Sequence, residues 1–513
     1  MSSLGKKKGR RYSRIAPHDD ESSSFFTPSP MVDSKDGKSV SELDLRSTVT
    51  GRNEPTYIPP WTEPYVIGIA GFSGSGKTSV SQRIIQELNQ PWTVLLSFDN
   101  FYKPLTPEDY KLVAENNYDF DTPDSIDIDL AVETLRSLKE GKKTEIPVYS
   151  FAQHARTDKK ITIYGATVII IEGIYALYDK RLLDLMDIKV FVDTELDLCL
   201  ARRLTRDILY RGRNVEGVIR QWERFVKPNS VASVAPTMQN ADLVIPRGLD
   251  NSTAIDVMIK HIQNKLALKS AEHLERLKAL GLSNKIELSS LDNLKLLPRN
   301  NHTAGIHSIL FDVHTERTDF IFYFDRIANL LIEQALEQLT CFEETSVSCP
   351  SGYEYKGLKP THDFVAVSII RSGDCFMNSL RKTFPDIPVG KLLIQSDSLT
   401  GEPQLHMEAL PQINEKSQYF LFDAQIISGA GAIMAIQVLL DHEVKERNIV
   451  LISYLSTEVG VRRIFNVFPN ITLIVGRLSN MEEVNQEFNS EGFKDTDWMF
   501  RNRFIDSLYF GTD

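Results

Sequence analysis

The first half of the chain alternates short apolar runs with amphipathic stretches. Four such runs predict strands at residues 65–70, 94–98, 167–171 and 188–192, and the stretch at 77–88 predicts a helix. Strands that are apolar along their whole length are typical of a parallel sheet covered by helices on both faces. Combined with the alternation of strands and helices, this pattern predicts an α/β fold.

A second α/β pattern occupies the C-terminal half. It begins near Asp312, with a long amphipathic helix at 320–339 and strands at 364–370, 419–423, 449–454 and 471–475. Before it, Lys, Glu and Leu at helical spacing predict a connector, and the first 60 residues lack any periodicity. The sequence therefore predicts a disordered tail at 1–62, an α/β domain at 63–255, a helical connector at 256–305 and a second α/β domain at 306–513.

Composition narrows the class of protein. The 513 residues include 58 basic and 69 acidic side chains, for a net charge of −11, which argues against a nucleic-acid partner. The cysteines (Cys199, Cys341, Cys349 and Cys375) show no spacing typical of disulfides or zinc, and no apolar run reaches the roughly 18–20 residues that span a membrane. We expect a soluble cytoplasmic protein. The basic run Lys6–Arg11 would also suit nuclear import, although a solvated charge cluster is the simpler interpretation.

The first predicted strand and helix are joined by a phosphate-binding motif. Its residues are Gly71, Phe72, Ser73, Gly74, Ser75, Gly76, Lys77 and Thr78, which match G-x-x-x-x-G-K-[ST]. Glycines let backbone amides surround a phosphate, and the helix N-terminus favours the same anion. Lys77 supplies a charge for the β- and γ-phosphates, and the Thr78 hydroxyl suits Mg²⁺. The motif predicts binding of ATP, with GTP as an alternative.

Two carboxylates follow predicted strands. Asp99 comes just after the second strand, and Glu172 follows the third. Ligands of open parallel sheets bind beyond the carboxyl ends of the strands, so both acids are placed to serve a transferred phosphoryl group. A kinase needs one carboxylate near the acceptor hydroxyl and another for Mg²⁺. The alternative is a capping Asp and a surface Glu.

Arginines are crowded into a short stretch after the fourth strand. They are Arg202, Arg203, Arg206, Arg211 and Arg213, with Gly212 as a candidate hinge. Guanidinium groups bind phosphate and sugar hydroxyls, and a mobile basic lid would exclude water during transfer. A solvated basic helix is the alternative.

With these motifs in place, residues 65–250 resemble the uridine–cytidine kinase family. The resemblance rests on the stretches 71–78, 99–102, 118–124, 146–154, 172–174, 203–213, 225–228 and 245–248. It implies ATP-dependent phosphorylation of the 5′-hydroxyl of uridine and cytidine with Mg²⁺, by a P-loop domain with an arginine lid. It also implies a homo-oligomer, with a tetramer as one form, and feedback inhibition by pyrimidine triphosphates.

The same resemblance assigns roles to particular residues. The general base would be Asp99, the groups acting on the phosphates would be Lys77, Arg206 and Arg211, and the residues around Mg²⁺ would be Thr78, Asp99 and Glu172. The adenine of ATP would lie near Asp250. The ribose would be held by Asp121, Arg203 and Gln221, and the pyrimidine would be surrounded by Tyr149, Phe151, His154 and Arg213. The residue types suit these tasks, since a carboxylate accepts from two ribose hydroxyls and an imidazole can donate or accept.

The second half resembles uracil phosphoribosyltransferases more loosely. The similarity lies at 320–326, 369–373, 388–391 and 509–512. The family's phosphoribosyl-pyrophosphate loop is altered: Asp423 and Ser428 suit it, but Ala430 replaces a glycine. The family's uracil-binding loop is replaced by residues 503–508, and Ser396 stands where an arginine is expected. We therefore expect a domain retained for binding, regulation or oligomerisation, without transferase activity.

Three alternatives remain open on the sequence. A P-loop kinase for another small alcohol would share the phosphate loop and Asp99 but would not need the aromatic pocket at 149–154. A bifunctional enzyme would also make UMP from uracil and phosphoribosyl pyrophosphate. A nucleotide sensor without turnover would not need Lys77, Asp99 and Glu172 together.

Overall fold

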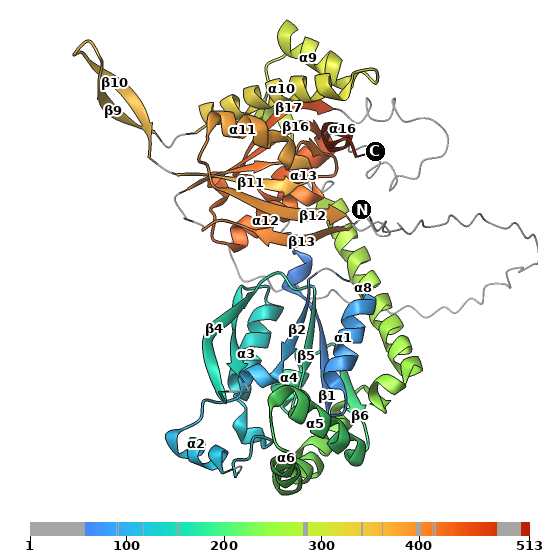
Figure 1. Ribbon diagram of the computed structural model, residues 1–513. Helices are drawn as coiled ribbons and strands as arrows, with labels where there is room; N and C mark the ends of the chain where they lie inside the picture. The colour runs from blue at the N-terminus through green and yellow to red at the C-terminus, as the bar shows by residue number, and fades with distance from the viewer. Residues whose placement is uncertain are drawn as a thin grey trace, which may run out of the picture. The chain divides into compact units, whose positions relative to one another are not determined.

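The computed structural model describes residues 57–479 and 504–512, apart from residues 89, 91, 116, 151–152, 281–285, 340–341, 362, 397–401, 413 and 415–416 (Figure 1). Its architecture is built on two main sheets, each packed against helices. The predicted fold class, a parallel-sheet domain followed by a second α/β domain, is confirmed. Among the described helices, none is long and apolar enough to cross a membrane.

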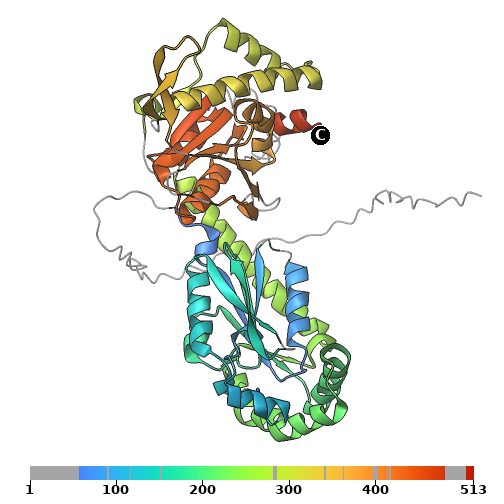
Figure 2. The ribbon, with the colours of Figure 1, turned by 60° about the vertical axis from the view of Figure 1, so that its left-hand side comes forward.

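The first sheet has five parallel strands. They are β1 (Tyr65–Gly71), β2 (Thr93–Ser97), β5 (Val168–Glu172), β6 (Ile188–Asp193) and β7 (Leu243–Pro246), in the order β2-β5-β1-β6-β7. Alternate residues of β1 enter different cores: Ile67 packs with α1 (Lys77–Leu88) and α8 (Ser252–Leu280), whereas Val66 packs with α3 (Ile128–Lys139) and α4 (Lys180–Leu183). Helices therefore cover both faces, as Figure 2 shows. This burial on both faces explains why the two central strands, β1 and β5, are apolar along almost their whole length.

The carboxyl ends of these strands lead into the segments that form the candidate site. Strand β1 enters the phosphate loop, and β2 enters η2 (Phe98–Phe101), which carries Asp99. The hairpin of β3 (Thr144–Ser150) and β4 (Ala155–Ile163) and the helices α2 (Pro107–Ala114), α5 (Leu196–Arg211) and α6 (Val215–Gln221) surround this edge. The sequence did not predict the hairpin, because most of β4 is exposed and polar and Pro147 interrupts β3.

The second sheet has eight strands, mostly parallel. Its order is β13-β12-β11-β14-β16-β17-β8, and β15 pairs with β16. The strands are β8 (Leu294–Leu296), β11 (Phe364–Ile370), β12 (Val389–Ser396), β13 (Pro403–Ala409), β14 (Gln418–Phe422), β15 (Gln425–Ile426), β16 (Ile449–Thr457) and β17 (Thr472–Ser479). Helices α9 (Asn301–Phe311), α10 (Arg317–Glu337), α11 (Met377–Thr383) and α16 (Phe504–Phe510) share one core, and α12 (Ala430–Asp441) and α13 (Glu458–Val467) share the other. Strands β9 (Phe342–Ser348) and β10 (Glu354–Pro360) form a separate exposed hairpin.

Two aromatic residues that the sequence assigned to the N-terminal tail belong to the folded structure. Tyr57 and Trp61, assigned to the tail, are 6% and 1% exposed and belong to a hydrophobic core that includes residues of both halves. The Trp61 indole and the Tyr164 hydroxyl donate to the same Asp441 carboxylate oxygen, at 3.0 and 2.6 Å. Residues 57–62 are therefore part of the folded structure, and the other domain boundaries remain predictions.

Candidate active site

The phosphate loop needs glycine for steric reasons. Gly74 has a φ of +89°, and a Cβ there would approach the carbonyl oxygen of Cys199 to 2.5 Å. At Gly71 a Cβ would approach the carbonyl oxygen of Val192 to 2.4 Å. A side chain at either position would displace neighbouring backbone. The loop leads directly into α1, whose first residue is Lys77, so backbone amides and the positive end of the helix face the same space.

Lys77 provides a desolvated cation in this loop. Its side chain is buried, and its ammonium group donates to the carbonyl oxygen of Phe72 at 2.9 Å. Burial lowers the pKa of Lys77, and the nearby Glu172 and Asp99 oppose that shift. The Phe72 ring packs edge-on against Phe191 and belongs to the hydrophobic core. The Lys77 ammonium therefore has little contact with water, so its attraction to a phosphate is only weakly screened.

The two predicted carboxylates lie beside the loop. Because β5 lies between β1 and β2, Glu172 pairs in register with both Ile69 and Ser97. The Thr78 hydroxyl donates to the Glu172 carboxylate at 3.1 Å, and burial raises the pKa of Glu172. Asp99 lies at the start of the turn after β2 and lines the same pocket.

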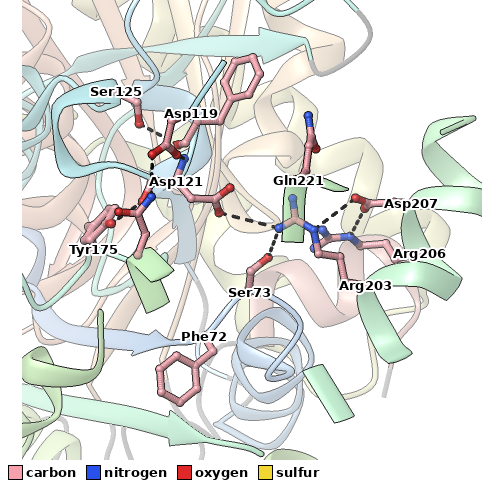
Figure 3. Close-up of polar contacts among 12 residues, drawn as sticks. Phe72, Ser73, Asp119, Asp121, Ser125, Tyr175, Arg203, Arg206, Asp207 and Gln221 are labelled. Carbon is pink, nitrogen blue, oxygen red and sulfur yellow. Dashed lines mark hydrogen bonds and ion pairs between the residues drawn. The ribbon is translucent and has the colours of Figure 1, made fainter. Parts of the chain in front are cut away.

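The predicted arginine lid is a cluster around one carboxylate. Asp207 on α5 is completely buried and lies within 2.8–3.6 Å of guanidinium nitrogens from Arg203, Arg206, Arg211 and Arg213. Arg203 also donates to the Ser73 hydroxyl at 2.8 Å and lies 3.8 Å from Asp121, as Figure 3 shows. The cluster therefore connects the phosphate loop to the opposite side of the pocket.

The side of the pocket opposite the phosphate loop carries aromatic rings and polar groups. The His154 imidazole stacks on Phe120 with ring centroids 5.1 Å apart, and Tyr102 lies 5.1 Å from Tyr149. Burial and the neighbouring Arg213 lower the pKa of His154, which favours the neutral imidazole at neutral pH. A neutral imidazole beside aromatic rings can form a hydrogen bond to a planar ring ligand in either direction.

Asp121 provides a carboxylate between the phosphate loop and the aromatic rings. Burial raises its pKa, and Arg203 opposes that shift. Its backbone amide donates to the Asp119 carboxylate at 2.9 Å, and its carbonyl oxygen accepts from the Tyr175 hydroxyl, so the loop is fixed on both sides. Gln221 accepts from Arg213 at 3.0 Å at the rim of the pocket.

One pocket contains most of the residues that the sequence singled out. These are Ser73, Gly74, Lys77, Thr78, Asp99, Asp121, Tyr149, His154, Glu172, Arg203, Arg206, Arg211, Arg213 and Gln221. Four other residues of the phosphate loop do not line the pocket: Gly71, Phe72, Ser75 and Gly76. Asp250 also lies outside the lining and forms an ion pair with Arg202 at 3.3 Å. Arg202 also donates to the carbonyl oxygen of Ser75, so Asp250 lies near the loop. Phe151 lies outside the described residues.

Sequence reasoning missed several lining residues. Tyr102, Tyr118, Phe120, Ile174 and Phe225 also face the pocket. The alternation of aromatic and acidic residues at 118–121 was the available signal for two of them, because residues two apart in an extended segment point the same way. The sequence gives no signal for Asp207, because an acid between arginines on a helix is typical of surface ion pairs.

In the second half, two acids of the transferase-like region are paired with neighbouring side chains. The Asp423 carboxylate, 2% exposed, accepts from the Ser372 hydroxyl at 2.6 Å. Asp506 on α16, within the segment that departs from the transferase pattern, pairs with Arg371 at 2.8 Å. Both contacts involve a residue of one of the two segments, around 423–431 and 503–508, whose sequence departs from the transferase pattern.

Comparisons with known proteins match both halves. The model of the phosphoribulokinase/uridine kinase family matches residues 66–254, and that of uracil phosphoribosyltransferase matches residues 297–496. The chain is 50% identical to a uridine kinase of Saccharomyces cerevisiae, with 98% of this chain and 99% of the relative covered. It is 42% identical to uridine-cytidine kinase-like 1 of Mus musculus (81% and 77% covered) and 40% identical to uridine-cytidine kinase A of Dictyostelium discoideum (88% of each).

Proposed function

Because this chain belongs to the uridine kinase family, we propose that it transfers the γ-phosphoryl group of ATP to the 5′-hydroxyl of uridine and cytidine, giving UMP and CMP. One observation carries the proposal: a single pocket has the phosphate loop and arginines on one side, aromatic rings with a neutral imidazole on the other, and Asp99 in its lining. Such a pocket suits a triphosphate facing a nucleoside. The reaction would serve pyrimidine salvage in the cytoplasm.

The phosphate side would act by electrostatic stabilisation. Phosphoryl transfer requires little covalent chemistry from the protein and depends on positioning and on neutralising charge on the transferred group. The loop amides and Lys77 would hold the β- and γ-phosphates, and Arg206 and Arg211 would approach from the lid. Asp250 and Arg202, paired beside the loop, would lie towards the adenine end of ATP.

The same edge of the sheet fits Mg²⁺. Within the described residues no group of three acidic, His or Cys side chains forms a metal site by itself. Mg²⁺ is usually held by one or two carboxylates together with substrate phosphates and water, so a full protein cage is not required. Thr78, Asp99 and Glu172 would hold it, and the bound ion would neutralise charge on the phosphates.

The acceptor would be held between Asp99 and the aromatic side. Asp99 would accept the proton of the 5′-hydroxyl, Asp121, Arg203 and Gln221 would bind the ribose hydroxyls, and Tyr149, His154 and Arg213 would surround the base. The neutral His154 suits both pyrimidines, because it can donate to the oxygen of uracil or accept from the amine of cytosine. Phe151 keeps the role that the family resemblance gives it.

Uridine is expected to be preferred over 2′-deoxyuridine by a factor on the order of 10²–10⁴ in kcat/KM. A site built to bind a hydroxyl leaves buried polar groups unpaired when that hydroxyl is missing, and Asp121 is such a group. Steady-state kinetics with both nucleosides measures the ratio, and Asp121→Asn should reduce it. Equal kcat/KM for the two substrates would remove Asp121 from ribose recognition.

We also propose that the second half is a binding or assembly domain without transferase activity and that the chain forms a homo-oligomer, with a tetramer as the family's pattern. The hydrogen bond from Ser372 to Asp423 and the ion pair between Arg371 and Asp506 support the absence of transferase activity. Pyrophosphate release with uracil and phosphoribosyl pyrophosphate would instead favour a bifunctional enzyme.

The proposed function is tested by following ADP production by the full-length protein with Mg-ATP and uridine, cytidine, thymidine, adenosine or pantothenate. We expect turnover with uridine and cytidine and little with the others. Thymidine lacks the 2′-hydroxyl that Asp121 would bind, adenosine carries a larger base, and pantothenate offers no ring to the aromatic side chains of the pocket. Turnover with pantothenate or another small alcohol alone would replace this function with that of a different P-loop kinase. Binding of ATP without any turnover would indicate a sensor.

A further inference from the structure

Asp207 holds four arginines without lining the pocket itself. Its carboxylate is 0% exposed, and its two oxygens lie 2.8 Å from Arg206, 3.5 Å from Arg213 and 3.6 Å from both Arg203 and Arg211. Each of the four arginines lines the pocket, whereas Asp207 lies behind them on α5. Figure 3 shows the pairing with Arg206.

The backbone of the same residue fixes the end of the helix. The amides of Gly212 and Arg213 both donate to the carbonyl oxygen of Asp207, the second at 3.0 Å, and Gly212 adopts a left-handed φ of +62°. This turn reverses the chain after Arg211 and brings Arg213 back beside the carboxylate. Asp207 therefore takes part in the turn through its backbone carbonyl and in the arginine cluster through its side chain.

Electrostatics explains why a carboxylate is needed there. Four cations converge on one anion, so the arginines repel one another. Burial lowers the pKa of Arg211, and Arg206 adds to that shift while Asp207 opposes it. Burial alone would raise the pKa of Asp207, but Arg206 and Arg203 outweigh it and keep that pKa below its ordinary value. An ionised Asp207 is thus the group that keeps the guanidiniums together.

We propose that Asp207 is a positioning residue for phosphoryl transfer: it holds Arg206 and Arg211 towards the phosphate loop and contacts neither ATP nor the nucleoside. The inference rests on the proposed function. Arg206 and Arg211 share a pocket with Lys77, and Arg203 is hydrogen bonded to Ser73 of the loop, so the cluster is already directed at the phosphates. Displacement of such groups by about 1 Å can reduce turnover by about 10²-fold.

Asp207→Asn tests the proposal, because it keeps the shape and removes the charge. We expect kcat to fall by about 10²-fold and KM for ATP to change by less than about 5-fold, since the loop and Lys77 are untouched. Glu216→Gln is the matched control: Glu216 also pairs with an arginine, Arg220 at 2.7 Å, but on the exposed surface of α6. That variant should keep wild-type kinetics.

A double-mutant cycle with Arg206→Ala separates positioning from a general structural role. If Asp207 acts through the arginines, Asp207→Asn should cost much less in kcat when Arg206 is already absent. Fully additive losses, or a kcat for Asp207→Asn within about 3-fold of wild type, would overturn the proposal. If Asp207→Asn does not fold, as judged by thermal denaturation, Asp207→Glu takes its place in the cycle, because the longer side chain keeps the charge but shifts it.

The choice of acceptor distinguishes this inference from the proposed function. Wild-type turnover with uridine or cytidine and an unaffected Asp207→Asn variant would overturn the inference alone. Turnover only with a different acceptor would overturn the proposed function, and the same cycle would then be scored with that acceptor. Absence of turnover with every acceptor would overturn both.

Discussion

Asp99→Asn is expected to lower turnover by about 10²-fold or more while leaving ATP and uridine binding close to wild type, because a lost general base usually costs this much. Asp99 follows β2 at the carboxyl edge of the first sheet and shares its pocket with Lys77 and Glu172. An amide can still form a hydrogen bond with the acceptor hydroxyl but cannot take its proton. The kinetics are measured by ADP release, and binding by equilibrium titration.

Asp124→Asn provides the matched control for this prediction. Asp124 is an exposed carboxylate on η3 (Pro123–Ser125), close in sequence to the ribose-side loop but outside the pocket lining. Its substitution should leave kcat and KM unchanged. Near-normal turnover in Asp99→Asn would remove Asp99 from the mechanism and redirect attention to Glu172 as the acid next to the acceptor.

Lys77→Met is expected to reduce kcat/KM by about 10³-fold, the upper range for removing one preorganised charge-stabilising group. Lys77 is the one lysine in the described lining of the pocket. Because it is buried, water screens its attraction to a bound phosphate only weakly. Methionine has a similar length and carries no charge, so the loop can keep its shape. The comparison needs initial rates at several ATP concentrations.

Lys103→Met is the control for the second prediction. Lys103 lies just beyond the Asp99 turn but is exposed, and its backbone amide donates to the carbonyl oxygen of Ser125. It is not among the lining residues of the pocket that the structure describes. It should keep wild-type rates. A Lys77→Met variant that retains more than about a tenth of kcat/KM would mean that the arginines alone neutralise the transferred phosphoryl group.

Buried parallel strands were predictable from the sequence because burial on both faces leaves continuous apolar runs. Strands β1, β2, β5 and β6 were predicted within one residue at each end, and α1 was predicted with its bounds. Strand β4 was not, since five of its nine residues are exposed and no apolar alternation marks it. Likewise, Trp61 is buried through contacts with residues far along the chain, such as Asp441, which local composition cannot reveal.

The site shows the same division between local and long-range information. Lys77, Asp99 and Glu172 follow strands, so topology alone brings them together. The role of Asp207 depends on how an α-helix turns four arginines towards one carboxylate, and an acid among basic residues on a helix usually indicates only surface pairing. The tertiary structure alone distinguishes these two cases.

Incubation of the full-length protein with [γ-³²P]ATP, Mg²⁺ and uridine, followed by separation of the nucleotides formed, tests most directly whether the protein phosphorylates the nucleoside. We expect labelled UMP with the phosphate on the 5′-oxygen, in an amount equal to the ADP formed, and labelled CMP when cytidine replaces uridine. Accumulation of ADP without a labelled nucleoside monophosphate would contradict the proposed function. So would the absence of both products from protein that binds ATP.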